Sequence, residues 1–260
     1  MDLGLGGRRV LITGGSQGIG YAVAKGFLDE GCHVAIAARD QARLDQAVAT
    51  LSTQAAGRIE AKSIDLAQRG AAEALAEAYP ETDILVNNAG AVPIGDIFEI
   101  DETRWRAAWD LKVFGFVNLT RAMYARMRRH PPKVIVNILG TGADKPQWRY
   151  ACGTPANIAL LGLTKALGGR SIDDGIRVVA VSPGAVETER WRAIHMKRAR
   201  EKFGDESRWR DALLDQPQNR AAHVEEVANV VVFLASDRAS WVCGEAVTVD
   251  GGRLYREQWF

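Results

Sequence analysis

The chain has 260 residues, 47% of them apolar, which is enough for one large domain with a substantial hydrophobic core. A net charge of +1 creates no overall field that favours nucleic acid or an anionic membrane. Its three cysteines show neither a metal-ligand spacing nor an even count, and no membrane-length apolar run or signal peptide is present, so we expect a cytoplasmic protein with no metal site.

Short apolar runs alternate with longer amphipathic ones along the chain. Runs rich in Val, Ile, Leu and Ala predict strands at 9–13, 33–37, 59–63, 84–87, 133–138, 177–181 and 246–249. Apolar residues three and four positions apart predict helices at 18–30, 40–54, 66–78, 102–129, 154–171 and 224–235. This alternation predicts a single α/β domain over residues 1–260, with a doubly wound parallel sheet of about seven strands.

A glycine-rich turn, TGGSQGIG, follows the first predicted strand at residues 13–20. Gly14 permits a tight turn, Gly18 lets a pyrophosphate approach the backbone, and Gly20 lets the next helix close on the sheet. The buried strand before the motif and the helix after it are the context that a dinucleotide site requires. The motif therefore predicts that the chain binds a dinucleotide.

Segment 187–220 is predicted to be the one irregular insertion in the alternation of strands and helices. Trp191 and Trp209 are interleaved with many cationic residues between Arg190 and Arg210. This pattern suits an anionic or aromatic substrate, or else a solvated amphipathic helix whose tryptophans pack on the body. His195 in this segment is a further acid or base candidate, although a lone histidine is more often structural.

Further motifs extend the match along the chain: Asp65-Leu66, NNAG at 87–90, SPGAVET at 182–188, FLASD at 233–237 and VDGG at 249–252. With the glycine-rich turn, they make the chain resemble the short-chain dehydrogenase/reductase family from about Gly7 to Gly252. The resemblance implies a seven-stranded Rossmann sheet, a nicotinamide dinucleotide cofactor, a small-molecule substrate and a homodimer or homotetramer. It also implies that segment 187–220 covers the substrate. It implies cofactor contacts from Gly14, Ser16, Gln17, Gly18, Ile19, Gly20, Arg39, Asp65, Leu66, Asn87, Ala89, Gly90, Pro183, Gly184, Val186 and Thr188.

The end of the second predicted strand bears on the choice of cofactor. NAD-preferring members of the family typically carry an Asp where this chain has Ala38. Arg39 instead supplies a guanidinium that suits the 2′-phosphate of NADP. We therefore expect NADP(H), with NAD(H) as the alternative.

Members of the family usually share an Asn, a Ser, a Tyr and a Lys that act on the substrate oxygen and the ribose. The aligned motifs put Lys112, Gly140, Gly153 and Asn157 at these four positions, so all four depart from the pattern. Asn and Lys are exchanged between two helices. Lys112 is predicted to restore the missing cation, against the alternative of an ordinary ion pair with a carboxylate.

Tyr150 is predicted to replace the missing phenol. It lies about one helical turn before Gly153. It also lies seven positions before Asn157, which is the Tyr-to-Lys separation of enoyl reductases in this superfamily. The alternative is a tyrosine in a pocket wall or an interface. Cys152 is expected to be a small buried side chain rather than a nucleophile.

These observations predict an NADP-dependent oxidoreductase acting on a carbonyl, an alcohol or an activated alkene. Tyr150 would be the acid, Lys112 the cation or proton relay, and Asn157 a residual ribose ligand. The alternative is a catalytically inactive homologue that binds the dinucleotide as a sensor or partner subunit. A non-redox enzyme is disfavoured because the glycine-rich turn is complete.

Overall fold

The computed structural model describes residues 1–53 and 58–256. Seven parallel strands form one sheet in the order β3-β2-β1-β4-β5-β6-β7. They are β1 (Arg9–Thr13), β2 (His33–Ala38), β3 (Ile59–Ser63), β4 (Ile84–Asn87), β5 (Lys133–Ile138), β6 (Ile176–Pro183) and β7 (Ala246–Val249). The predicted doubly wound Rossmann sheet is confirmed. Only the second and sixth strands differ from their predicted bounds, and both are longer.

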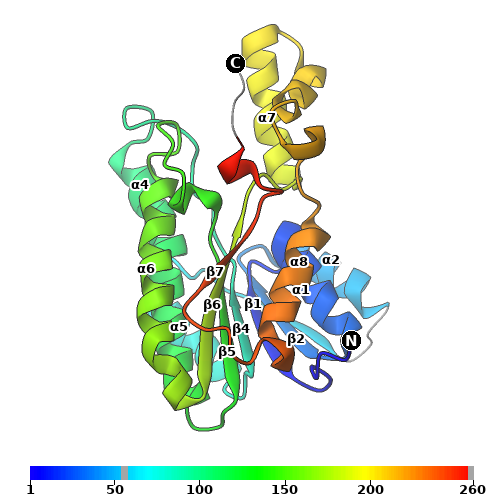
Figure 1. Ribbon diagram of the computed structural model, residues 1–260, viewed down its shortest axis with the longest axis vertical. Coiled ribbons are helices and arrows are strands. Elements are labelled where there is room, and N and C mark those ends of the chain that lie inside the picture. The colour runs from blue at the N-terminus through cyan, green and yellow to red at the C-terminus, as the bar shows by residue number, and fades with distance from the viewer. Residues whose placement is uncertain (54–57, 257–260) are drawn as a thin grey trace.

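Helices cover both faces of the sheet (Figure 1). One face is covered by α1 (Gly18–Asp29), α2 (Gln41–Ser52) and α8 (Val224–Ala235). The other is covered by α3 (Ala71–Ala78), α5 (Gly115–Met127) and α6 (Gly153–Ser171). No helix among the described residues is both long and apolar enough to cross a membrane.

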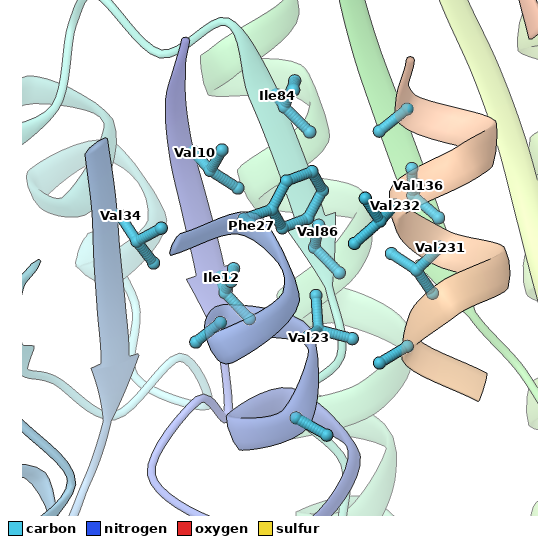
Figure 2. Close-up of a cluster of buried hydrophobic side chains, with 14 of the residues drawn as sticks. Val10, Ile12, Val23, Phe27, Val34, Ile84, Val86, Val136, Val231 and Val232 are labelled. Carbon is cyan, nitrogen blue, oxygen red and sulfur yellow. The ribbon is translucent and has the colours of Figure 1, made fainter. Parts of the chain in front are cut away.

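The alternation of side chains along each strand supplies both cores. Val10 and Ile12 of β1 face α1 and α8, whereas Leu11 between them faces α3 and α5. Figure 2 shows Phe27 of α1 between β1 and α8, where it contacts Val232 and its neighbours. Phe27 is fully buried, so this aromatic ring ties one layer of helices to the sheet.

Two of the predicted helices needed correction. The helix predicted at 66–78 begins at Ala71, because Gly70 before it adopts a left-handed conformation with φ of 79°. Residue 54, at the end of the helix predicted at 40–54, lies outside the described residues. The helix predicted at 102–129 is three segments: α4 (Glu102–Trp109), a π-helical turn over Asp110–Phe114, and α5. A π-helical turn inserts one extra residue into a helix and is frequent at functional sites.

Segment 187–220 is mostly helical, which agrees with the alternative of an amphipathic helix and not with an irregular insertion. The segment contains α7 (Glu189–Phe203), followed by 3-10 helices at Glu206–Leu213 and Pro217–Asn219. Thr188 caps the start of α7 by accepting a hydrogen bond from the amide of Trp191, and Gly204 ends it in a left-handed conformation. α7 stands beyond the carboxyl end of β6 and projects from the body of the molecule (Figure 1).

Candidate active site

The glycine-rich turn brings backbone close to backbone at the end of β1. Gly14 has φ of 67°, and a Cβ added there would lie 2.9 Å from Asn88 Nδ2 and 3.0 Å from Ala89 Cα. A Cβ added at Gly20 would overlap the carbonyl oxygen of Gly14, so Gly20 packs beneath the turn. Only glycine fits these two positions without moving the backbone.

The start of α1 leaves amide groups available for an anion. Gln17 is the residue before the helix, and its side chain makes no capping hydrogen bond. The first amides of a helix lack intrahelical acceptors and lie at the positive end of the helix dipole. Gly18 in this first turn has φ of 58° and no side chain to cover these amides. The residues present therefore fit the diphosphate of a dinucleotide.

A cavity of about 540 Å³ runs along the carboxyl ends of the central strands. This edge of a doubly wound sheet is where ligands of such folds bind. Most of the predicted cofactor contacts line the cavity, namely Gly14, Ser16, Gln17, Gly18, Ile19, Arg39, Leu66, Ala89, Gly90 and Thr188.

The other predicted contacts lie elsewhere. Pro183, Gly184 and Val186 line an adjoining cavity, and Gly20, Asp65 and Asn87 line neither. Asn87 is fully buried, and its Nδ2 donates to Thr120 Oγ1 at 3.1 Å and to Asn137 Oδ1 at 2.9 Å. Asn87 thus ties β4 to β5 and α5 and has no free donor for a ligand.

Arg43 lines the first cavity and was missed by the sequence analysis. Its Nη1 donates to Gln17 Oε1, and its Nε lies 3.3 Å from the carboxylate of Asp40. Arg39 lines the cavity from the residue after β2. The sequence contained one signal for Arg43: it lies only four residues after Arg39, and α2 begins between the two residues. Two guanidinium groups therefore lie at this end of the cavity.

The adjoining second cavity has a volume of about 1,110 Å³ and extends between the body and α7. Ile19, Gly90, Lys112, Leu139, Thr188 and Arg190 line both cavities, so the two meet at these residues. Tyr150, Gly140 and Gly142 line only the second cavity. The predicted catalytic side chains thus gather near one junction rather than along the chain.

Lys112 is buried at this junction. It comes from the π-helical turn, and its Nζ donates to the carbonyl oxygen of Leu139 at 3.3 Å. It makes no ion pair with any carboxylate among the described residues. Burial, with a smaller contribution from the charge of Arg190, lowers the pKa of Lys112 to about 8. Its ammonium is thus an uncompensated charge between the two cavities.

The ring of Tyr150 lies over Gly153. A Cβ added at Gly153 would overlap this ring, and a Cβ added at Gly142 would lie 3.0 Å from its Cδ1. The two glycines therefore make the space that the tyrosine fills. Burial raises the pKa of Tyr150, an effect that the Asn157 amide and the charge of Arg190 only partly offset. The phenol is consequently protonated at neutral pH.

Asn157 lies fully buried on α6 beside this phenol. Neither Nδ2 nor Oδ1 of its amide has a hydrogen-bond partner among the described residues. A Cβ added at Gly140 would lie 3.3 Å from the Asn157 Nδ2. Because an unpaired buried amide costs free energy, the Tyr150 hydroxyl beside it is the group best placed to partner Asn157. Asn157 does not line either cavity.

The first turns of α7 form the wall opposite these residues. Arg190 Nη2 donates to the carbonyl oxygen of Val92 at 2.7 Å, which joins α7 to the loop after β4. Trp191 stacks on His195 with ring centroids 3.8 Å apart. Burial lowers the pKa of His195, which favours the neutral ring. Cys152 is buried, and burial raises the pKa of its thiol, so it lacks the thiolate of a nucleophile.

Comparisons with known proteins agree with this architecture. The profile of the family described as Enoyl-(Acyl carrier protein) reductase matches residues 14–253. Galactitol 2-dehydrogenase (L-tagatose-forming) of Cereibacter sphaeroides is 34% identical over 251 residues, which are 95% of each chain. Acetoacetyl-CoA reductase of Shinella zoogloeoides is 31% identical over 251 residues, covering 95% of this chain and 99% of that one.

Solved structures show the same similarity. L-sorbose reductase from Gluconobacter frateurii, complexed with NADPH and L-sorbose, superposes with a TM-score of 0.92 at 33% identity, covering 99% of this chain and 100% of that one. A short chain dehydrogenase/reductase family protein superposes with a TM-score of 0.85 at 33% identity, covering 98% and 100%. Sequence and fold agree over nearly the whole chain, which therefore belongs to the short-chain dehydrogenase/reductase family.

Proposed function

We propose that this protein is an NADP(H)-dependent oxidoreductase whose proton donor is Tyr150, acting on a carbonyl, an alcohol or an activated alkene. The observation that carries the proposal is the ring of Tyr150 in the space that a side chain at residue 153 would take. The family's usual tyrosine corresponds to Gly153. A phenol is thus present beside the junction of the cavities, although it comes from a different position of the chain.

The residues of the first cavity support NADP(H) as the cofactor. The open amides of α1 suit the diphosphate, and the guanidinium groups of Arg39 and Arg43 suit a 2′-phosphate. No acidic side chain occupies residue 38, where an aspartate would repel that phosphate. The structural neighbour L-sorbose reductase carries NADPH. When bound, the nicotinamide would supply or accept a hydride.

The chain's own residues would handle the accompanying proton. Tyr150 is protonated at neutral pH like any tyrosine, and burial raises its pKa further. It would donate its hydroxyl proton to the substrate oxygen or to an enolate carbon. The ammonium of Lys112 at the junction would stabilise the negative charge that develops during reduction. Asn157 is buried beside the phenol, which favours a role in orienting the Tyr150 hydroxyl over the direct ribose contact expected from the sequence.

The direct test is consumption of NADPH in the presence of ketoses, 3-oxoacyl thioesters and enoyl thioesters. These classes follow the names of the matched family and relatives. Tyr150→Phe should lower kcat by about 100-fold or more, since it removes the general acid and little else. The matched control is Tyr79→Phe, which removes a hydroxyl far from both cavities and should retain full activity. Equal activity of both variants would refute the role of Tyr150.

The competing function is a catalytically inactive homologue that binds the dinucleotide as a sensor or partner subunit. The departure of Lys112, Gly140, Gly153 and Asn157 from the family's usual residues favours it. Tight NADPH binding without turnover of any compound in the panel would support this alternative. Both functions use the same cofactor cavity and differ only in whether hydride is transferred.

We also infer that the protein is a homo-oligomer. An open groove on α5 and α6 is lined by Val117, Leu163 and Leu167 together with several arginines. Relatives of this family commonly pair through the corresponding helices. Light scattering of the purified protein should show a dimer or tetramer, and a monomer at micromolar concentration would contradict this inference.

A further inference from the structure

The second cavity carries an excess of positive charge. Its lining includes five cationic side chains, those of Lys112, Arg149, Arg190, Arg198 and Arg253, and two carboxylates, those of Asp211 and Asp215. Both carboxylates already bind guanidinium groups, Asp211 that of Arg208 at 2.6 Å and Asp215 that of Arg253 at 2.8 Å. Arg149 pairs with Glu99 at 3.1 Å.

Three of the lining cations have no carboxylate within 4.0 Å among residues 1–53 and 58–256. They are Lys112, Arg190 and Arg198. Arg190 donates hydrogen bonds to the carbonyl oxygens of Gly90 and Val92. These acceptors are neutral and leave its positive charge uncompensated. Lys112 is buried, whereas Arg190 and Arg198 are exposed to solvent. The two guanidinium groups can therefore bind an anion that enters the second cavity.

Two of these three cations, Arg190 and Arg198, lie on one face of α7. Arg190, Ile194 and Arg198 are four residues apart and line the same cavity, so they succeed one another along one side of the helix. Arg190 and Arg198 are thus separated by roughly 12 Å along the helix axis. The stacked rings of Trp191 and His195 lie between them and give this wall a flat aromatic middle.

Arg190 and Arg198 differ in what they face. Arg190 lines both cavities and lies at the junction with Lys112, where the cofactor's reacting end would meet a substrate. Arg198 lines the second cavity and not the first, so the phosphates of a dinucleotide do not account for it. The charge of Arg198 instead acts on His195, where it adds to the effect of burial in keeping the pKa of that ring low.

We infer that the substrate carries an anionic group, a carboxylate or a phosphate ester, which binds Arg198 while the reacting carbon lies at the junction beside Lys112 and Tyr150. The inference rests on the proposed function for the identity of the reacting end. It adds the substrate class: an oxo or hydroxy compound with a negative charge several atoms from the carbon that exchanges hydride. Guanidinium binds both kinds of anion through paired hydrogen bonds.

The experiment compares three six-carbon probes that differ only at C1: glucitol, gluconate and glucitol 1-phosphate. Oxidation by NADP⁺ is measured for each with the wild-type protein. We expect kcat/KM for at least one anionic probe to exceed that for glucitol by about tenfold or more, the size of one good charged contact. Comparison of gluconate with glucitol 1-phosphate distinguishes a carboxylate site from a phosphate site.

Two variants on the same helix provide the contrast. Arg198→Gln should abolish the advantage of the anionic probe through a higher KM with kcat little changed, because this residue lies away from the reacting end. Arg200→Gln removes the same charge from an exposed residue that lines neither cavity, and it should retain the advantage. Equal loss in both variants would show only a general effect of charge and would overturn the inference.

A binding measurement separates this inference from the proposed function. Calorimetric titration of the same three probes into the protein with saturating NADP⁺ requires no hydride transfer. Binding of an anionic probe to wild-type protein and to Arg200→Gln, but not to Arg198→Gln, supports the anion site even if no probe is oxidised. Binding of glucitol as tight as that of both anions, or no binding of any probe, would overturn it.

Discussion

At the scale of single residues, the site depends on glycines that make room for a displaced tyrosine. Tyr150 fills the space beside Gly153, and a Cβ at that position would overlap its ring. Under the proposed function, this packing would let Tyr150 take the place of the family's usual tyrosine, for which this chain has Gly153. It also means that the two positions are energetically coupled, because only one of them can hold a large side chain there.

This coupling is measurable in a double-mutant cycle. Gly153→Ala should destabilise the protein by about 1–3 kcal/mol, because the Tyr150 ring must move from its packed position. In a Tyr150→Ala background the same change should cost nothing or stabilise, since alanine favours a helix more than glycine does. Urea unfolding of the four proteins gives the coupling free energy. Additive effects would show that the ring does not occupy this space.

The buried ammonium of Lys112 gives a signature in the pH dependence of stability. Its pKa is about 8 in the folded protein against 10.5 for an ordinary lysine, so the unfolded chain binds more protons between these values. The free energy of unfolding therefore rises with pH through this window, and the full cost of burying the charge is present below about pH 8. Lys112→Met should stabilise the apoprotein at pH 7 by up to about 3 kcal/mol and should remove this rise.

Urea unfolding from about pH 7 to about pH 10 measures this effect. Lys145→Met provides the control. The side chain of Lys145 is exposed in the folded protein, so its removal should leave the rise with pH unchanged. The free energy of unfolding of the wild-type protein could instead follow the same pH dependence as that of Lys112→Met, without the rise. That result would contradict an uncompensated ammonium at Lys112.

The residue scale also shows what the sequence predicts and what it misses. The closeness of Tyr150 to Gly153 follows from their spacing of three residues, about one helical turn. The unpartnered amide of Asn157 and the contact of Arg43 with Gln17 depend on where separate segments meet, and no local pattern reports that. The alternative of an ion pair for Lys112 was open in the sequence. The structure decides it, because its Nζ binds the carbonyl of Leu139.

At the scale of elements, strands were easier to predict than helix ends. A buried parallel strand is a short, continuous apolar run with sharp limits, and five of the seven strands keep their predicted bounds. The π-helical turn at Asp110–Phe114 was not predictable, since one added residue hardly disturbs a helical pattern of apolar residues. For segment 187–220 the sequence left an irregular insertion and an amphipathic helix open, because the charges on α7 obscure its periodicity.

The packing of α1 against β1 and α8 should respond strongly to loss of Phe27. This ring is fully buried in the centre of one core, so Phe27→Ala removes its contacts and leaves a cavity. We expect a loss of about 3–5 kcal/mol in the free energy of unfolding. Phe98→Ala is the matched control, because Phe98 is 86% exposed and should change stability little. Similar losses in both variants would contradict the assigned core.

At the scale of the whole molecule, the strand order brings distant parts of the chain to one edge of the sheet. The turn after β1, the segment after β2, the loop after β4 and the start of α7 all line the first cavity. The alternation of strands and helices predicted this sheet, and its carboxyl edge follows from the parallel arrangement. For the substrate side, the sequence predicted a cationic segment with tryptophans that suits an anionic or aromatic substrate. The charges of the second cavity depend on the docking of α7, which the sequence does not specify.

The proposed function depends most on a dinucleotide that binds in the first cavity with its 2′-phosphate near Arg39 and Arg43. Calorimetric titration with NADPH and NADH tests this most directly. The account predicts one NADPH bound per chain, about tenfold or more tighter than NADH, with the difference reduced in Arg43→Gln. No heat with either dinucleotide at millimolar concentration, or tighter binding of NADH, would contradict it.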